Sequence, residues 1–229
     1  MKLSFITLFP DMIHAVMKTG VIGRGLDKGI IQVETINPRD FVEDTYASVD
    51  DTPYGGGPGM IMKVEPLIKA YESIEKDVST RTFIMTPGGK TFQQKTATEL
   101  SKSTHLIFIC GRYEGIDERV KTILQPEEIS LGDFVLTGGE LAALTIADAS
   151  CRLIEGTLGC FESTLYESFS EQSGGLEHPH YTRPQEFRGH TVPEVLLSGN
   201  HKAIETWRQE QAQALTQAKR PDLLASSLS

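Results

Sequence analysis

The sequence predicts an α/β fold built on a parallel sheet, because short apolar runs with the character of strands alternate with segments of helical character. The strand-like runs are Leu3–Phe9, Ile30–Ile36, Thr82–Thr86 and His105–Cys110. The last run is almost continuously apolar, as is typical of a strand that is covered on both faces. Glycines follow several of these runs, which places loops at the carboxyl edge of the sheet, where ligands bind in such folds.

Helices are expected between and after these strands. Thr91 and Gln94 have the spacing of a capping box, and Asn200 suits an N-cap position. The expected helices are Pro10–Lys18, Pro66–Lys76, Thr91–Lys102, a segment that continues through Glu118–Val120, and Asn200–Ala218.

The stretch Leu131–Ile154 carries the clearest turn and helix signals of the chain. We expect a short strand, a turn at Gly138 and Gly139, and then an apolar helix. Thr137 and Glu140 are three residues apart, so we predict that they form a capping box. The two glycines either let a ligand approach the backbone or permit a tight turn and close helix packing.

The chain of 229 residues is long enough for a main domain and a smaller one. After Ile154 the sequence becomes rich in Gly, Ser, Pro and charged residues and loses its periodicity. We expect a main domain over residues 1–158, a flexible linker over residues 159–175 and a mainly helical domain over residues 176–229. The net charge of -9 counts against non-specific nucleic-acid binding but does not exclude a local basic face.

Composition also bears on location and metals. No apolar window is long enough to cross a membrane, and the first residues lack a signal peptide's apolar core, so we expect a cytoplasmic protein. The three cysteines are not spaced as metal-ligand pairs, which favours reduced thiols. His178 and His180 are a weak zinc signal without a cysteine partner, and no metal site is predicted.

Two glycine-rich segments need separate interpretations. Tyr54–Met60, YGGGPGM, is expected to be a loop, because glycine and proline disfavour the interiors of helices and strands. Gly89-Lys90-Thr91 looks like the end of a P-loop, but Ile84 stands where that motif requires its first glycine. The mismatch excludes a P-loop nucleotide hydrolase.

Three glycine-containing loops, after Met85, Cys110 and Leu136, follow expected strands and are predicted to converge on one site. Arg112 and Glu114 flank Tyr113 in the second loop. They are either part of that site or a surface salt bridge beside a helix start.

Five strings carry a family resemblance: SVDDTPYGGGPGM at residues 48–60, CGRYEGIDERV at 110–120, LGDFVLTGGELAALTIADASCR at 131–152, PHYTRP at 179–184 and VPEVLLSGNH at 192–201. In this order they resemble the bacterial tRNA (guanine-N1)-methyltransferases of the SPOUT superfamily. The resemblance covers nearly the whole chain. It implies a deep trefoil knot in the main domain, a homodimer, and transfer of a methyl group from S-adenosyl-L-methionine to N1 of guanine 37 in tRNA.

The resemblance also implies which residues hold the cofactor. They belong to the same three loops that the strand pattern singles out. The residues carried over are Met85, Thr86, Pro87, Gly88, Gly89, Gly111, Tyr113, Glu114, Leu131, Gly132, Asp133, Val135, Leu136, Gly138 and Gly139. Mg²⁺ is a further cofactor of the family, although no carboxylate cluster in the sequence stands out as its ligand set.

For catalysis, the resemblance implies Glu167 as the general base that removes the N1 proton and Arg152 as the cation near O6. The family has Asp in an Asp-Ser-Phe pattern where this chain has Glu167, which extends the carboxylate by about 1 Å, the length gained from one methylene. We hypothesise that the linker has adjusted, since the run after it looks slightly longer than in the family. The alternative is that Glu162 or Glu171 serves as the base.

For RNA, the carried-over residues are Asp50, Gly59, Arg112, Ser163, Ser168 and Arg183. Two other functions stay open. A different SPOUT methyltransferase would modify another RNA position, and a catalytically weak or inactive RNA-binding protein would follow if Glu167 disables the site.

Overall fold

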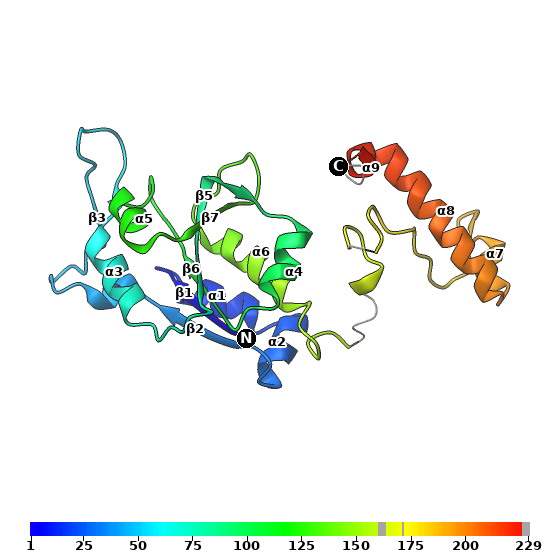
Figure 1. Ribbon diagram of the computed structural model, residues 1–229, viewed down its shortest axis with the longest axis horizontal. Coiled ribbons are helices and arrows are strands. Elements are labelled where there is room, and N and C mark those ends of the chain that lie inside the picture. Colours follow the sequence, from blue (N-terminus) through cyan, green and yellow to red (C-terminus); the bar gives the residue numbers. More distant parts are fainter. Residues whose placement is uncertain (160–163, 171, 226–229) are drawn as a thin grey trace. The chain divides into compact units, whose positions relative to one another are not determined.

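The computed structural model describes residues 1–159, 164–170 and 172–225. The chain divides into two compact units, an N-terminal unit, Met1–Gly159, and a C-terminal unit, Cys160–Ser229 (Figure 1). Among the described residues, none of the helices combines the length and apolar character needed to cross a bilayer.

The N-terminal unit is built on a five-stranded sheet of β1 (Lys2–Ile6), β2 (Gln32–Ile36), β5 (Arg81–Thr91), β6 (His105–Ile109) and β7 (Glu127–Ser130). Its strand order is β2-β1-β6-β5-β7, and each pairing is parallel. The predicted α/β class with a parallel sheet is therefore confirmed. The central strand β6 is buried along its whole length, which explains its almost unbroken apolar sequence.

Helices cover both faces of this sheet, as successive side chains of a strand point to opposite sides. On β6, Leu106 and Phe108 join the core under α1 (Pro10–Met17), α2 (Gly20–Asp27), α4 (Gln94–Leu100) and α6 (Glu140–Cys151). Ile107 and Ile109 join the core under α3 (Val64–Glu72) and α5 (Glu118–Leu124). The ring of Phe108 stacks between Phe5, 5.2 Å away, and Phe83, 5.9 Å away.

The glycine-rich segment Tyr54–Met60 is a loop, as predicted, and four of its glycines have positive φ. It joins the short antiparallel strands β3 (Asp50–Asp51) and β4 (Ile61–Met62). A single 3₁₀ turn, η1 (Pro38–Phe41), precedes them.

The strand expected at residues 131–136 is wrong. The last strand of the sheet is β7, which ends at Ser130, and residues 131–139 have no regular secondary structure. β7 lies at the edge of the sheet, where Glu127 and Glu128 are exposed. Because these two residues are charged, the strand does not form an apolar run and was not predicted. Gly132 has φ +143, which favours glycine and ends the extended path.

Both capping boxes are also wrong. The N-cap of α6 is Gly139 without a side-chain hydrogen bond, because the Glu140 carboxylate is engaged elsewhere in the core. Thr91 is the last residue of β5 and pairs with Ser130, so it is too far into the sheet to cap α4.

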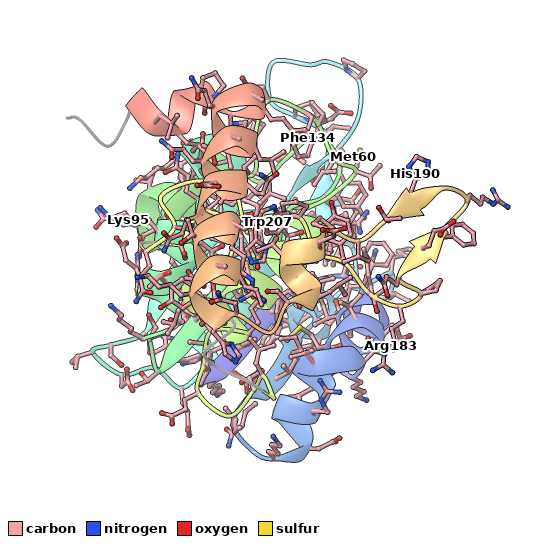
Figure 2. The ribbon with its side chains drawn as sticks, turned by 90° about the vertical axis from the view of Figure 1, so that its right-hand side faces the viewer. Met60, Lys95, Phe134, Arg183, His190 and Trp207 are labelled. Atoms are coloured by element: carbon pink, nitrogen blue, oxygen red, sulfur yellow. The ribbon has the colours of Figure 1, made fainter. Side chains whose placement is uncertain are left out.

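The C-terminal unit contains the hairpin β8 (Glu186–Phe187) and β9 (His190–Thr191), followed by α7 (Glu194–Leu197), α8 (His201–Lys219) and α9 (Pro221–Ala225). The predicted cap of α8 is confirmed, because Oδ1 of Asn200 accepts from the Ala203 N–H at 3.2 Å. Trp207 projects from this helix and its ring lies 6.3 Å from that of Tyr181 (Figure 2).

The turn that precedes residue 177 is tied to α8. The Leu176 N–H donates to Oγ1 of Thr216 at 2.9 Å, and a Cβ on Gly175 would lie only 2.7 Å from the same oxygen. The structure therefore positions residues 175 and 176 directly against a buried threonine of the long helix.

Candidate functional site

A cavity of ≈ 390 Å³ opens in the N-terminal unit beside residues 84–87 in the middle of β5 and beyond the carboxyl ends of β6 and β7. This volume lies within the range of about 300–1,000 Å³ that is usual for small-molecule sites. Its walls come from the three segments that were predicted to converge, although the first of them, after Met85, is part of strand β5 and not a loop. The cavity is thus where an open parallel sheet is expected to hold a ligand.

Most of the residues predicted to hold a cofactor line this cavity. They are Met85, Thr86, Pro87, Gly111, Tyr113, Glu114, Leu131, Gly132, Val135, Leu136, Gly138 and Gly139. Gly88, Gly89 and Asp133 are not among its lining residues, whereas Arg112, predicted as an RNA contact, is.

An irregularity in β5 shapes the first wall. Met85 and Lys90 both pair with Ile129 of β7, so the residues between them bulge out of the ladder. A Cβ on Gly89 would lie 2.3 Å from the backbone nitrogen of Ile129, whereas a Cβ on Gly88 would meet no atom within 4 Å. Gly89 is therefore required by contact with β7, and Gly88 faces open space.

The glycine pair before α6 is explained by packing within the protein. The Gly139 N–H donates to the Gly111 carbonyl at 2.8 Å, and a Cβ on Gly139 would lie 2.9 Å from Cα of Cys110. A Cβ on Gly138 would lie 2.3 Å from Nε of Arg112. Of the two interpretations considered above, close packing accounts for both glycines, although they also border the cavity.

Arg112 is held by a buried ion pair. Its Nε lies 2.8 Å from Oε2 of Glu140, whose side chain is 0% exposed. The guanidinium carbon also lies 4.3 Å from the centre of the Phe9 ring. The alternative considered above, a surface salt bridge between Arg112 and Glu114, is wrong. The ion-pair partner of Arg112 is the buried Glu140.

Glu140 does not line the cavity, but it holds the lining residue Arg112, a role that sequence reasoning missed. Its Oε1 accepts from Oγ1 of Thr7 at 2.8 Å, and the Thr7 oxygen in turn accepts from the Phe9 N–H at 3.0 Å. The signal was present, because Glu140 falls on the same helical stripe as the buried residues Ala143, Leu144 and Ala147. A carboxylate on that stripe needs a buried partner.

The glycine-rich loop packs against the second wall of the cavity. A Cβ on Gly59 would lie 2.3 Å from Cγ of Glu114, and the Glu114 N–H donates to the Met60 carbonyl at 3.0 Å. Burial, together with a hydrogen bond from the phenol to Asp50, raises the pKa of Tyr113. Asp50 and Gly59 are thus brought beside the cavity, although the sequence had assigned them to RNA.

The remaining predicted residues lie outside the cavity. Arg152 is the partly buried C-cap residue of α6, whereas Glu167, Ser168 and Arg183 belong to the C-terminal unit. The Glu167 carbonyl accepts from Oγ of Ser173 at 2.8 Å, so its backbone is part of a hydrogen-bonded turn. Ser163 and the alternative bases Glu162 and Glu171 fall outside the described residues.

Comparison with known proteins shows which family this chain is similar to. The family model described as tRNA (Guanine-1)-methyltransferase TrmD matches residues 1–226. A tRNA (guanine-N(1)-)-methyltransferase of Carboxydothermus hydrogenoformans is 54% identical over 224 residues, which cover 98% of this chain and 87% of that protein. The protein of the same name from Staphylococcus carnosus is 51% identical over 225 residues, 98% of this chain and 91% of the relative.

Proposed function

Because this chain belongs to the tRNA (guanine-1)-methyltransferase family, we propose that it transfers a methyl group from S-adenosyl-L-methionine to N1 of guanine 37 in tRNA. The observation that carries the proposal is the cavity in which the middle of β5 meets the loops after β6 and β7. We also propose that the protein is a SPOUT-superfamily enzyme with a trefoil knot, that it forms a homodimer and that it is cytoplasmic.

The cavity fits the proposed cofactor in size and in the character of its walls. Its loops offer backbone N–H and C=O groups, and Met85, Leu131 and Leu136 supply apolar surface for a flat ring. The cofactor, when bound, supplies a methyl group on a sulfonium that needs no further activation.

The protein then has to bind the guanine in line with that methyl group and remove the proton from N1. We assign proton removal to the carboxylate of Glu167, and stabilisation of the negative charge that develops on O6 to the guanidinium of Arg152. A carboxylate that accepts from N1–H also reads the Watson–Crick edge of the base. One side chain would therefore select guanine and activate it.

The longer side chain of Glu167 requires a compensating backbone position. The turn that follows it supports such an adjustment, because the Phe169 N–H donates to the Gly175 carbonyl at 2.8 Å and closes a loop over the intervening residues. The Glu167 carbonyl is fixed within this turn by the Ser170 N–H and Oγ of Ser173. We propose that the extra residues after Glu167 are accommodated here.

Two groups of residues are assigned to the proposed partners. Phe134, Val135 and Leu141 expose large apolar side chains, 56%, 90% and 47%, which suits a subunit interface. Arg183 is exposed in the C-terminal unit and is proposed, with Ser163 and Ser168, to contact tRNA. Mg²⁺ is proposed as a further cofactor without an assigned ligand set.

The test uses the full chain, labelled S-adenosyl-L-methionine and an unmodified tRNA transcript that carries guanine at positions 36 and 37. We expect label at N1 of guanine 37 from the wild type. Glu167→Gln should lose about 10²–10⁴-fold in rate, the usual contribution of a general base, while it still binds both ligands. Glu167→Asp should retain activity, and Glu186→Gln, which alters an exposed glutamate of β8, should behave as wild type.

Each outcome has a distinct meaning. If Glu167→Gln transfers at the wild-type rate, Glu167 is not the base, and Glu162→Gln and Glu171→Gln identify the residue that is. If the wild type labels another RNA position, a different SPOUT specificity replaces the proposal. If the wild type binds both ligands and transfers nothing, the chain is an RNA-binding protein, an alternative that the replacement of the family's Asp by Glu167 favours.

A further inference from the structure

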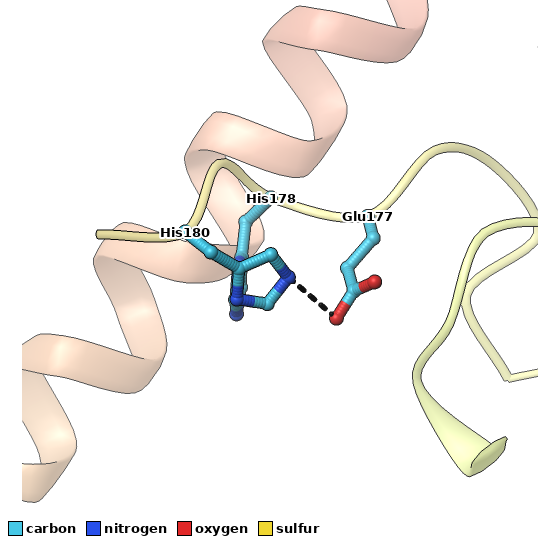
Figure 3. A group of neighbouring side chains, drawn as sticks. All are labelled: Glu177, His178 and His180. Atoms are coloured by element: carbon cyan, nitrogen blue, oxygen red, sulfur yellow. Dashed lines mark ion pairs between the residues drawn. The ribbon is translucent and has the colours of Figure 1, made fainter. Parts of the chain in front are cut away.

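Three side chains with metal-ligating atoms come together in the C-terminal unit, in the segment that leads into PHYTRP. One potential ligand atom from each of Glu177, His178 and His180 lies within 4.8 Å of the others. Nε2 of His180 lies 2.9 Å from Oε1 of Glu177, and the two imidazole centres are 4.6 Å apart (Figure 3). The figure shows the two rings one behind the other, with the carboxylate directed at His180.

We propose that Glu177, His178 and His180 bind a zinc ion, with solvent completing its coordination. Two imidazoles and a carboxylate are a ligand set that zinc uses in proteins. Imidazole favours zinc over magnesium, which prefers carboxylate, carbonyl and water oxygens. The set is therefore separate from any magnesium requirement of methyl transfer.

The geometry needs only a small adjustment. Tetrahedral zinc with bonds of about 2.0–2.1 Å brings its ligand atoms to about 3.3 Å from one another. The His180 and Glu177 atoms are 2.9 Å apart, so they have to separate by about 0.4 Å to reach that spacing. The ligand atom of His178 lies within 4.8 Å of the other two, so it has to approach them by at most about 1.5 Å.

The backbone on either side of the cluster is already held in place. The Glu177 N–H donates to Oγ of Ser168 at 2.9 Å, and the Leu176 N–H donates to Thr216. Pro179 restricts the backbone between the two histidines. Binding therefore has to order side chains rather than a whole loop, which lowers its entropic cost.

His178 supplies an independent indication. Its Nδ1 is buried and has no hydrogen-bond partner among the residues that the structure describes. A buried polar atom without a partner usually costs free energy, so its presence calls for an explanation. An ion pair between Glu177 and His180 alone, the competing account of this cluster, leaves that nitrogen unexplained.

The site is tested on the metal-free full chain by zinc titration against a chromogenic zinc indicator. We expect one zinc per chain, not displaced by excess Mg²⁺. His178→Ala, His180→Gln and Glu177→Gln should each weaken binding by at least about 10-fold, since even residues that only support metal ligands contribute 10–100-fold. His190→Ala and His201→Ala alter exposed histidines of the same unit and should bind as wild type.

One further variant and one measurement keep the result interpretable. Cys160→Ser tests whether a thiol is the ligand instead, and unchanged binding supports the proposal. Far-ultraviolet circular dichroism identifies any variant that fails to fold. If a histidine variant does not fold, zinc binding by Glu177→Gln, which conserves the shape of the side chain, decides whether the cluster is the site. Absence of stoichiometric zinc in the wild type, or equal loss in His190→Ala and His180→Gln, would overturn the assignment.

Discussion

The sharpest test of the cavity's construction replaces two neighbouring glycines separately with alanine. In Gly89→Ala the new Cβ would lie 2.3 Å from the Ile129 nitrogen and 2.6 Å from the Glu128 carbonyl carbon, both in the backbone of β7. Carbon atoms in contact normally stay about 3.5–4.0 Å apart, so β5 and β7 must separate by more than an ångström. In Gly88→Ala the Cβ meets no atom within 4 Å.

The cost can be worked out from what this separation breaks. An added methyl group in a filled site costs about 1–3 kcal/mol, and each lost ladder hydrogen bond about 0.5–1.5 kcal/mol. The pairs at risk are Lys90 with Ile129 and Thr91 with Ser130. We therefore expect Gly89→Ala to lower the free energy of unfolding of the N-terminal unit by about 2–6 kcal/mol. Gly88→Ala should leave it unchanged or raise it by about 0.4–1 kcal/mol, because alanine restricts the unfolded chain.

The assay has to report on the N-terminal unit by itself. Trp207, the single tryptophan of the chain, lies in the C-terminal unit, so its fluorescence is the internal control that this unit remains folded. Hydrogen exchange of peptides from β5 and β7, measured by mass spectrometry at equal protein concentration, reports on the ladder. Equal protection of these peptides in the two variants would refute the argument that Gly89 is required by contact with β7.

Three other predictions concern buried or capping side chains. Glu140→Gln should cost about 3 kcal/mol in the free energy of unfolding, near the lower end for a broken buried ion pair, because Arg112 keeps partial access to solvent. Burial raises the pKa of Cys151 to about 12 and that of Cys110 well above its ordinary value, so iodoacetamide at pH 8 should leave both thiols unmodified until the protein is unfolded, as peptide mass spectrometry can show. Asn200→Ala should reduce the stability of the C-terminal unit by about 1 kcal/mol, measured by urea unfolding with tryptophan fluorescence, because the cap of α8 is lost.

Each of these predictions has a control variant or an outcome that would contradict it. For the ion pair, a double-mutant cycle with Arg112→Met should show strong coupling, and additive effects would argue against a direct interaction. Modification of Cys110 or Cys151 in the native protein would mean that the core opens readily. For the cap, His201→Ala changes the next, exposed position and should have a smaller effect than Asn200→Ala.

Sequence reasoning recovered β1, β2, β6 and the first part of β5, but it missed β7 at one edge of the sheet. β1 and β6 were found because strands buried on both faces are apolar throughout, whereas β7 exposes two glutamates and resembles a loop. The helix α2 was missed because it contains glycines, which disfavour helices. A Cβ on Gly25 would lie 2.8 Å from Cδ1 of Ile31, so close packing is the reason for at least one of them.

The positions of the site loops were predictable, but the reasons for their residues were not. Local spacing suggested that Glu140 caps its own helix, whereas a residue 133 positions away in the chain, Thr7, is its hydrogen-bond partner. A capping box is a local pattern, and any buried partner can outcompete it.

The contacts around the cavity divide the proposed reaction between two parts of the chain. Its walls are fixed by interactions within the N-terminal unit, namely Gly139 against Cys110, Gly59 against Glu114 and Arg112 with Glu140. A site held by its own scaffold is largely formed before the ligand arrives. The proposed base, Glu167, lies in the other unit. Cofactor binding should therefore survive changes at Glu167 that abolish methyl transfer, which is why binding and transfer have to be measured on the same variant.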